Sequence, residues 1–102
     1  MKYNKLVRDR IPEIIQRNGQ TPITRIASDA EYFEKLKEKL KEEFCEFSEN
    51  PAEEELADIL EIVFAICDFK RINRKKLDAL RKKKAKERGA FKKRIILEET
   101  KP

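Results

Sequence analysis

The sequence predicts an all-α protein, folded as a helical bundle of about four helices. Only 2 glycines and 4 prolines interrupt the 102 residues, and the segments between them repeat their apolar side chains at helical rather than alternating spacing. Residues that cap or stop helices lie at the ends of these segments. We therefore expect a single domain over residues 1–102, with one short β pairing between residues 23–26 and 94–97.

The first two helices are marked by their beginnings. A short helix is expected over residues 12–17, because proline suits a first helical turn and the Asn-Gly pair that follows is a natural stop. Ser28 and Glu31 have the spacing of a capping box, in which the serine accepts from the amide three residues later and the glutamate reaches back. A long helix is expected to follow, as far as about Ser48.

The last two helices also have candidate caps. Asn50 and Pro51 are expected to cap and open a third helix, which ends at about Phe69. Three glutamates in its first turns lie where the helix dipole favours anions. Asn73 is expected to cap a fourth helix, which becomes very basic and ends near Gly89.

Composition excludes several kinds of chemistry. The chain has 25 Lys and Arg, 20 Asp and Glu, a net charge of +5 and no histidine. Without an imidazole there is no Ser-His-Asp or Cys-His device and no zinc-histidine cage. Cys45 and Cys67 lack the spacing of a zinc site, and we expect both to be core thiols. Any catalysis must use carboxylates, lysines, or a metal held by oxygen.

The length of the chain bears on its partners and its location. A domain this small hides a modest part of its surface and is often steadied by another subunit, so we expect a homodimer or a homotetramer. No apolar run approaches the roughly 20 residues that span a bilayer, and residues 1–10 lack the apolar stretch of a signal peptide. We expect a cytoplasmic protein that does not enter a membrane.

Two pairs of acids lie beside apolar faces of the second and third helices. Glu43 and Glu46 flank the apolar stripe expected for the second helix. That stripe consists of Phe33, Leu36, Leu40, Phe44 and Phe47. The third helix is apolar on nearly every side, and the row that begins with Glu55 and Asp58 continues into hydrocarbon. Glu61 lies on another side and is expected to be exposed.

A short connection between these helices predicts an antiparallel hairpin, which brings the two pairs together near its closed end. We call Glu43, Glu46, Glu55 and Asp58 the four-acid cluster. Four carboxylates in that space repel one another unless a cation neutralises them, and hard oxygen ligands suit Mg²⁺ or Mn²⁺. The alternative is that the glutamates of the second helix form surface salt bridges with lysines such as Lys39, while Glu55 only decorates a helix N-terminus.

The spacing of the four-acid cluster, ExxE followed by ExxD on two successive helices, resembles the metal-binding signature of the MazG-like all-α nucleoside triphosphate pyrophosphohydrolases. Two terminal motifs, YNKLVRDRIP at residues 3–12 and RGAF at residues 88–91, resemble a short single-domain branch of house-cleaning enzymes within that superfamily. Ala90 stands where the turn of that branch has a second glycine. The similarity spans essentially the whole chain.

The resemblance implies cleavage of a nucleoside triphosphate into the monophosphate and pyrophosphate, with Mg²⁺ held by the four-acid cluster. It implies a water positioned for in-line attack, for which the α-phosphorus is the expected target. Glu42 and Glu43 are the candidate catalytic carboxylates, with Glu42 as a base or a ligand of a further metal ion. The expected contacts of the phosphates are Lys5, Arg8, Lys86 and Arg88. Phosphoribosyl-ATP pyrophosphohydrolase, of the same superfamily, is the alternative within the enzyme class.

Two rival functions come from other classes. A pI of about 9.2 and the basic run at residues 81–86 are typical of a helical module that binds nucleic acid. That reading leaves the four-acid cluster unexplained, since it would repel DNA, and we do not expect nucleic acid as a partner. A helical interaction module that oligomerises without turnover is the second rival.

Overall fold

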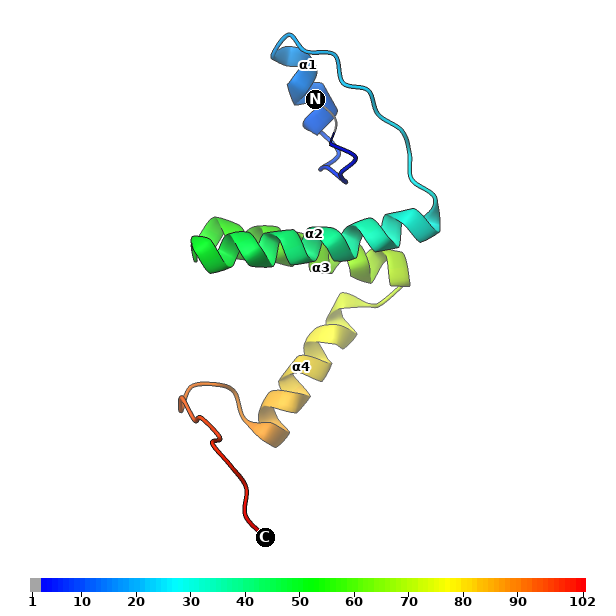
Figure 1. Cartoon of the computed structure of the whole chain (residues 1–102). Helices are drawn as coiled ribbons and strands as arrows, with labels where there is room; N and C mark the ends of the chain where they lie inside the picture. Colours follow the sequence, from blue (N-terminus) through cyan, green and yellow to red (C-terminus); the bar gives the residue numbers. More distant parts are fainter. Residues whose placement is uncertain (1–2) are drawn as a thin grey trace.

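The computed structural model describes residues 3–102, and within that range it contains four helices and no strand (Figure 1). The helices are α1 (Ile11–Arg17), α2 (Asp29–Glu49), α3 (Glu53–Lys70) and α4 (Arg74–Arg88). The predicted all-α class is confirmed. None of the helices described is long and apolar enough to cross a membrane.

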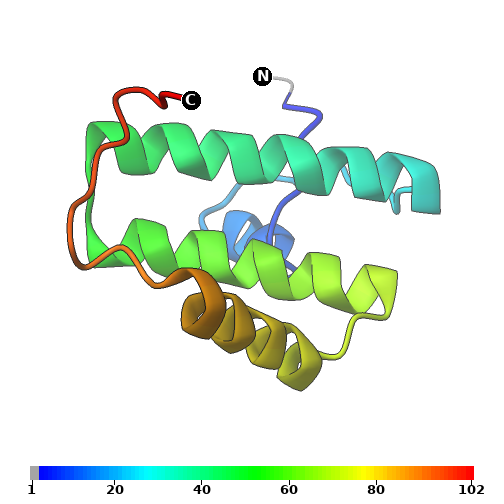
Figure 2. The same ribbon diagram turned by 90° about the horizontal axis from the view of Figure 1, so that it is seen from below.

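The antiparallel hairpin of α2 and α3 is the packed part of the molecule (Figures 1 and 2). Its buried apolar side chains are Leu36, Ile62 and Cys67. Near its open end the ring of Phe69 stacks on Phe33 and meets Tyr32 edge-on, with both pairs of ring centroids 5.4 Å apart. The hairpin therefore holds its two helices in the register that places the acids of their joined ends together.

Helix ends follow the local chemistry of the chain at several points. Ser28 accepts a hydrogen bond from the Glu31 amide at 3.3 Å, as predicted, while the Glu31 carboxylate turns to Arg25 and accepts from its guanidinium at 2.6 Å instead of reaching back. Asn73 accepts from the amides two and three residues later, at 2.8 and 3.2 Å, and caps α4 as predicted. These caps separate α2 and α4 from the segments that precede them.

The predicted cap of α3 is wrong. Asn50 ends α2 instead, donating its backbone N–H to the Glu46 carbonyl at 2.9 Å. The helix begins at Glu53, and Ala52 precedes it without a side-chain hydrogen bond. The proline at position 51 explains the difference, because it drives the residue before it out of the helical region, and Asn50 has φ −138° and ψ 86°.

The predicted β pairing is also wrong. Residues 23–26 and 94–97 contain no strand and lie on opposite sides of the hairpin (Figure 1). Ile23 is 97% exposed and Ile26 is 96% exposed, so these side chains have no surface to pack on. Branched side chains favour a strand only where a neighbouring strand and a packed face are present, and two strands alone are marginal in water.

The chain as a whole is far from compact. Its Cα radius of gyration is 18.4 Å, whereas a compact chain of 100 residues has about 13 Å. Phe44, expected in the core stripe, is 61% exposed, and Cys45 is exposed rather than a core thiol, while Cys67 is buried as expected. Within residues 3–102, α3 is the helix that packs extensively on α2, and it leaves the side chains of Phe44 and Cys45 exposed. Much apolar surface is thus exposed in the single chain.

Candidate metal centre

The closed end of the hairpin brings acids of both helices together. Carboxylate oxygens of Glu43, Glu55 and Asp58 all lie within 4.8 Å of one another, and those of Glu42, Glu43 and Glu46 form a second group with the same spacing. Glu43 belongs to both groups. The four-acid cluster therefore forms a continuous set of oxygens around Glu43, and Glu42 lies at its rim.

Two oxygens of this set lack a hydrogen-bond partner. Glu43 is only 6% exposed, and its Oε2 is buried without a partner, as is Oε2 of Glu55. An ionised carboxylate oxygen that loses water and gains no donor is costly to bury. These carboxylates could hold an oxygen-seeking cation, and the donor set fits Mg²⁺ or Mn²⁺ because it contains no thiolate or imidazole.

The same crowding disturbs the titration of the two glutamates. Burial, followed by the nearby charges of Glu46 and Asp58, raises the pKa of Glu43, and Lys39 opposes that rise. Burial and the same two acids raise the pKa of Glu55. Ionised carboxylates are thus disfavoured here unless a positive charge arrives.

Lysine and arginine side chains supply part of that charge. Arg8 Nη2 lies 2.6 Å from Asp58 Oδ1, and Lys5 Nζ lies 3.5 Å from Glu42 Oε1. Lys39 Nζ lies 3.7 Å from one oxygen each of Glu42 and Glu43. The salt bridge of the alternative interpretation is therefore present at Glu43, but Glu46 has no ion pair within residues 3–102. The Lys39 contacts also leave the buried oxygens of Glu43 and Glu55 unpaired.

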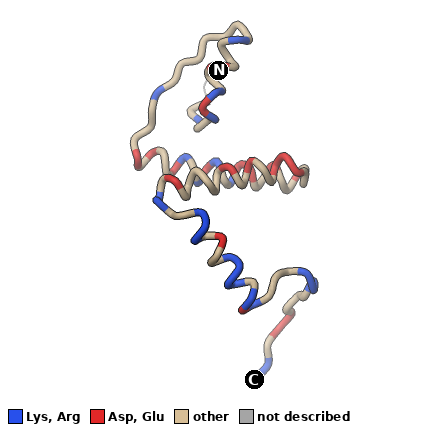
Figure 3. Tube along the Cα trace, turned by 180° about the vertical axis from the view of Figure 1, so that it is seen from behind, with Lys and Arg blue, Asp and Glu red and all other residues tan. Residues whose placement is uncertain are grey.

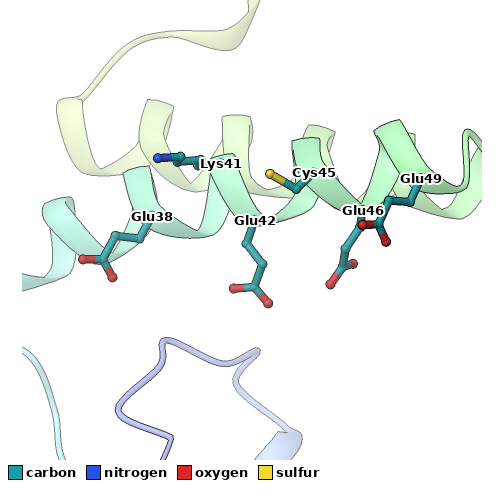
Figure 4. A pocket seen from close by; sticks show the side chains of 6 residues that line it. All are labelled: Glu38, Lys41, Glu42, Cys45, Glu46 and Glu49. Carbon is teal, nitrogen blue, oxygen red and sulfur yellow. The ribbon is translucent and has the colours of Figure 1, made fainter.

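Glu42 points to the side of α2 on which the N-terminal segment lies (Figure 4). Beside it is an open hollow of about 440 Å³, lined by α2 alone. The lining residues are Glu38, Lys41, Glu42, Cys45, Glu46 and Glu49. Glu42 is thus accessible from this surface and adjoins the cluster, as a proton acceptor beside a metal site must be.

The predicted phosphate contacts separate into two groups. Lys5 and Arg8 reach the acids, whereas Lys86 and Arg88 lie at the end of α4, and no ion pair joins them to the cluster in the described part of the chain. Figure 3 shows a similar division of charge along the backbone, with Lys and Arg prevailing on α4 and most of the Asp and Glu on the hairpin, which also carries lysines. Residues 74–94 carry twelve Lys and Arg against two acids, and residues 29–70 carry fourteen acids against five lysines.

Comparisons with known proteins leave the function to be argued from these residues. No protein-family model matches the chain, and no solved structure matches it significantly. A Mycolicibacterium smegmatis protein, described as uncharacterized, is 55% identical over 42 residues, which are 41% of this chain and 43% of that relative. The chain thus matches less than half of the relative's length, and the relative's description names no activity.

Proposed function

We propose that this protein hydrolyses a nucleoside triphosphate to the monophosphate and pyrophosphate, with Mg²⁺ or Mn²⁺ held by the four-acid cluster. The observation that carries the proposal is the buried, unpaired Oε2 of Glu43 at the centre of acids from two helices. The resemblance of the acid spacing and of both terminal motifs to the MazG-like enzymes supports the same activity. House-cleaning of non-canonical nucleotides is the proposed role.

The residues present divide the work of this reaction. Glu43, Glu46, Glu55 and Asp58 would hold the ion. When bound, the ion offsets the charge of the phosphates. A water attacks the α-phosphorus in line, the bond to the bridging oxygen breaks, and pyrophosphate leaves with that oxygen. Glu42, at the rim of the cluster, accepts the proton that the water loses.

The positive side chains near the cluster serve the anionic substrate. Lys5 already lies against Glu42, and Arg8 against Asp58. From these positions both side chains can contact a triphosphate that binds next to the acids. Lys86 and Arg88 are proposed as further phosphate contacts. Because α4 diverges from the hairpin of its own chain (Figure 1), we propose that these two residues act on the cluster of a second copy.

A homodimer or homotetramer is part of the proposal. The hairpin leaves Leu56 and Leu60, one turn apart on α3, 53% and 51% exposed. A second copy fits this face, because each copy carries both an acidic hairpin and a basic α4 of complementary charge. Association would bury the exposed leucines that the single chain leaves in water.

Product analysis tests the activity directly. Purified protein is incubated with canonical and modified nucleoside triphosphates and Mg²⁺, then with EDTA, and products are resolved by ion exchange. We expect a monophosphate and pyrophosphate that disappear on chelation. If no nucleoside triphosphate is turned over, phosphoribosyl-ATP is the next substrate to test. If that is not turned over either, the affinity of the protein for nucleic acid is measured as a function of salt concentration.

Variants of the cluster test the site. We expect Glu46→Ala and Asp58→Ala each to lower kcat by at least about 100-fold, because each removes a ligand of the ion that stabilises transition-state charge. Glu61→Ala, an exposed acid of the same α3, should keep wild-type turnover. Full activity of Asp58→Ala with Mg²⁺ would show that the site is elsewhere, even if the reaction is as proposed.

A further inference from the structure

The N-terminal segment, residues 4–10, supplies positive charge to acids that lie far along the sequence. Arg8 donates from Nη2 to Asp58 Oδ1 at 2.6 Å, across a separation of 50 residues. Lys5 Nζ lies 3.5 Å from Oε1 of Glu42, on α2. These two contacts join the segment to both helices of the hairpin.

A backbone contact holds this segment in place. Lys35, on α2, donates from Nζ to the Asn4 carbonyl at 3.0 Å. Asn4 has φ 48°, in the left-handed region that asparagine tolerates better than most residues. The segment is therefore attached to the hairpin by polar contacts, two of which are made to acids.

Arg8 and a divalent cation would compete for the same carboxylate. Asp58 shares its 4.8 Å group with Glu43 and Glu55, whose Oε2 atoms are buried and unpaired. Within residues 3–102, Arg8 is the cation paired with Asp58. A divalent ion placed among these three acids would repel the guanidinium, since the two positive charges would face one carboxylate.

We propose that Arg8 is an exchangeable counter-ion of Asp58, which partly neutralises the cluster when no metal is bound and is released when a divalent cation binds. This inference rests on the proposed metal site but not on the hydrolysis. Once released, the arginine and the neighbouring Lys5 are free to meet an anionic ligand of the metal, such as a phosphate. Metal binding thus prepares the segment for the substrate.

Thermodynamic linkage makes the exchange reciprocal. If Arg8 opposes the cation, the cation must loosen the contact of Arg8 by the same factor. Removing the guanidinium should therefore tighten metal binding, whereas the loss of a merely structural arginine would weaken it or leave it unchanged. The sign of the change in metal affinity therefore distinguishes an exchangeable counter-ion from a structural arginine.

The first test is a Mn²⁺ titration of the full chain without nucleotide, followed by electron paramagnetic resonance. We expect Arg8→Gln to bind Mn²⁺ about two- to fivefold more tightly than wild type, in line with the modest strength of a partly exposed ion pair. Arg10→Gln is the matched control, because it removes the same charge two residues away, from a pair with Glu13 at 3.1 Å. The Mn²⁺ affinity of Arg8→Lys should lie between the affinities of Arg8→Gln and wild type.

The second test uses the unaltered protein and so does not depend on how a variant folds. Backbone hydrogen exchange of residues 4–10 should become faster on addition of Mn²⁺, while that of α3 should not. Unchanged exchange in this segment, or Mn²⁺ affinity equal in Arg8→Gln and Arg10→Gln, overturns the inference. So does an absence of Mn²⁺ binding in every variant. Tighter binding by Arg8→Gln without turnover of any triphosphate would support the exchange and contradict the proposed hydrolysis.

Discussion

The Glu43 side chain is an acid that the hairpin buries in an unfavourable position. Its carboxylate is buried among other acids, and one of its oxygens has no partner. In the absence of divalent cation, we expect Glu43→Gln to raise the free energy of unfolding at pH 7 by about 1 kcal/mol, the lower end of the cost of an unsatisfied buried group. Urea denaturation in EDTA measures this difference.

The difference in free energy of unfolding between Glu43→Gln and wild type should depend on pH in a defined direction. Burial and the neighbouring acids raise the pKa of Glu43 above its ordinary value of 4.5 in the folded protein. The folded state therefore binds the proton more tightly than the unfolded state, and the stability that this adds is present below pH 4.5 and is lost as the pH rises through the raised pKa. The advantage of Glu43→Gln should accordingly be largest at pH 7 and shrink on acidification.

A matched substitution in the same helix controls for the change of net charge. Glu49→Gln alters an exposed acid of α2 and should leave the stability within about 0.5 kcal/mol of wild type at both pH values. Equal effects of the two substitutions would mean that long-range charge, and not the burial of Glu43, governs the stability. Added Mg²⁺ should raise the melting temperature of wild type and have a smaller effect on Glu43→Gln.

At the scale of the element, the start of α2 depends on one hydroxyl. Ser28 accepts from the Glu31 amide, and α2 belongs to the packed hairpin. We expect Ser28→Ala to lower the free energy of unfolding by about 1 kcal/mol, because the capped amide then has no acceptor in the protein. Ser48→Ala is the control, since its exposed hydroxyl only donates back to the Phe44 carbonyl. An equal loss in both variants would contradict the capping role.

The elements that were predictable are those governed by nearby residues. Ser28 and Asn73 mark helix beginnings through hydrogen bonds to amides two or three positions away, so their sequence context is sufficient. The meeting of the two acid pairs was predictable too, because helical spacing and a short connection determine it. Asn50 failed as a cap because Pro51 restricts its backbone, a local effect that outweighs the preference of its side chain.

Contacts between distant parts of the chain could not be predicted from local sequence patterns. The pairing of Arg8 with Asp58 spans 50 residues and follows no periodicity. The sequence predicts that Arg8 contacts phosphate, and it predicts no partner for this arginine within the protein. The β pairing failed for the related reason that apolar, branched residues predict a strand without specifying a partner. Residues 23–26 form no strand and lie exposed on the far side of the hairpin from residues 94–97.

At the scale of the molecule, the single chain lacks the core that its apolar residues could form. The hairpin buries the apolar side chains of Leu36, Ile62 and Cys67, and the radius of gyration of 18.4 Å is well above that of a compact domain of about 13 Å. The charge is divided as well, since acids predominate on the hairpin and Lys and Arg predominate on α4 (Figure 3). A symmetric pair of chains would bring opposite charges together twice and cover both hairpins.

This assembly predicts the effect of a charge on the open face of α3. We expect wild type to sediment as a dimer or tetramer at micromolar concentration, and Leu60→Glu to weaken association by at least about 100-fold, because a twofold interface contains the buried charge twice. Ile23→Glu changes a 97% exposed position in the connection between α1 and α2, and it should leave the oligomeric state measured by sedimentation unchanged. A wild-type protein that is monomeric at every concentration would contradict the assembly and with it the proposed action of Lys86 and Arg88 on a second copy.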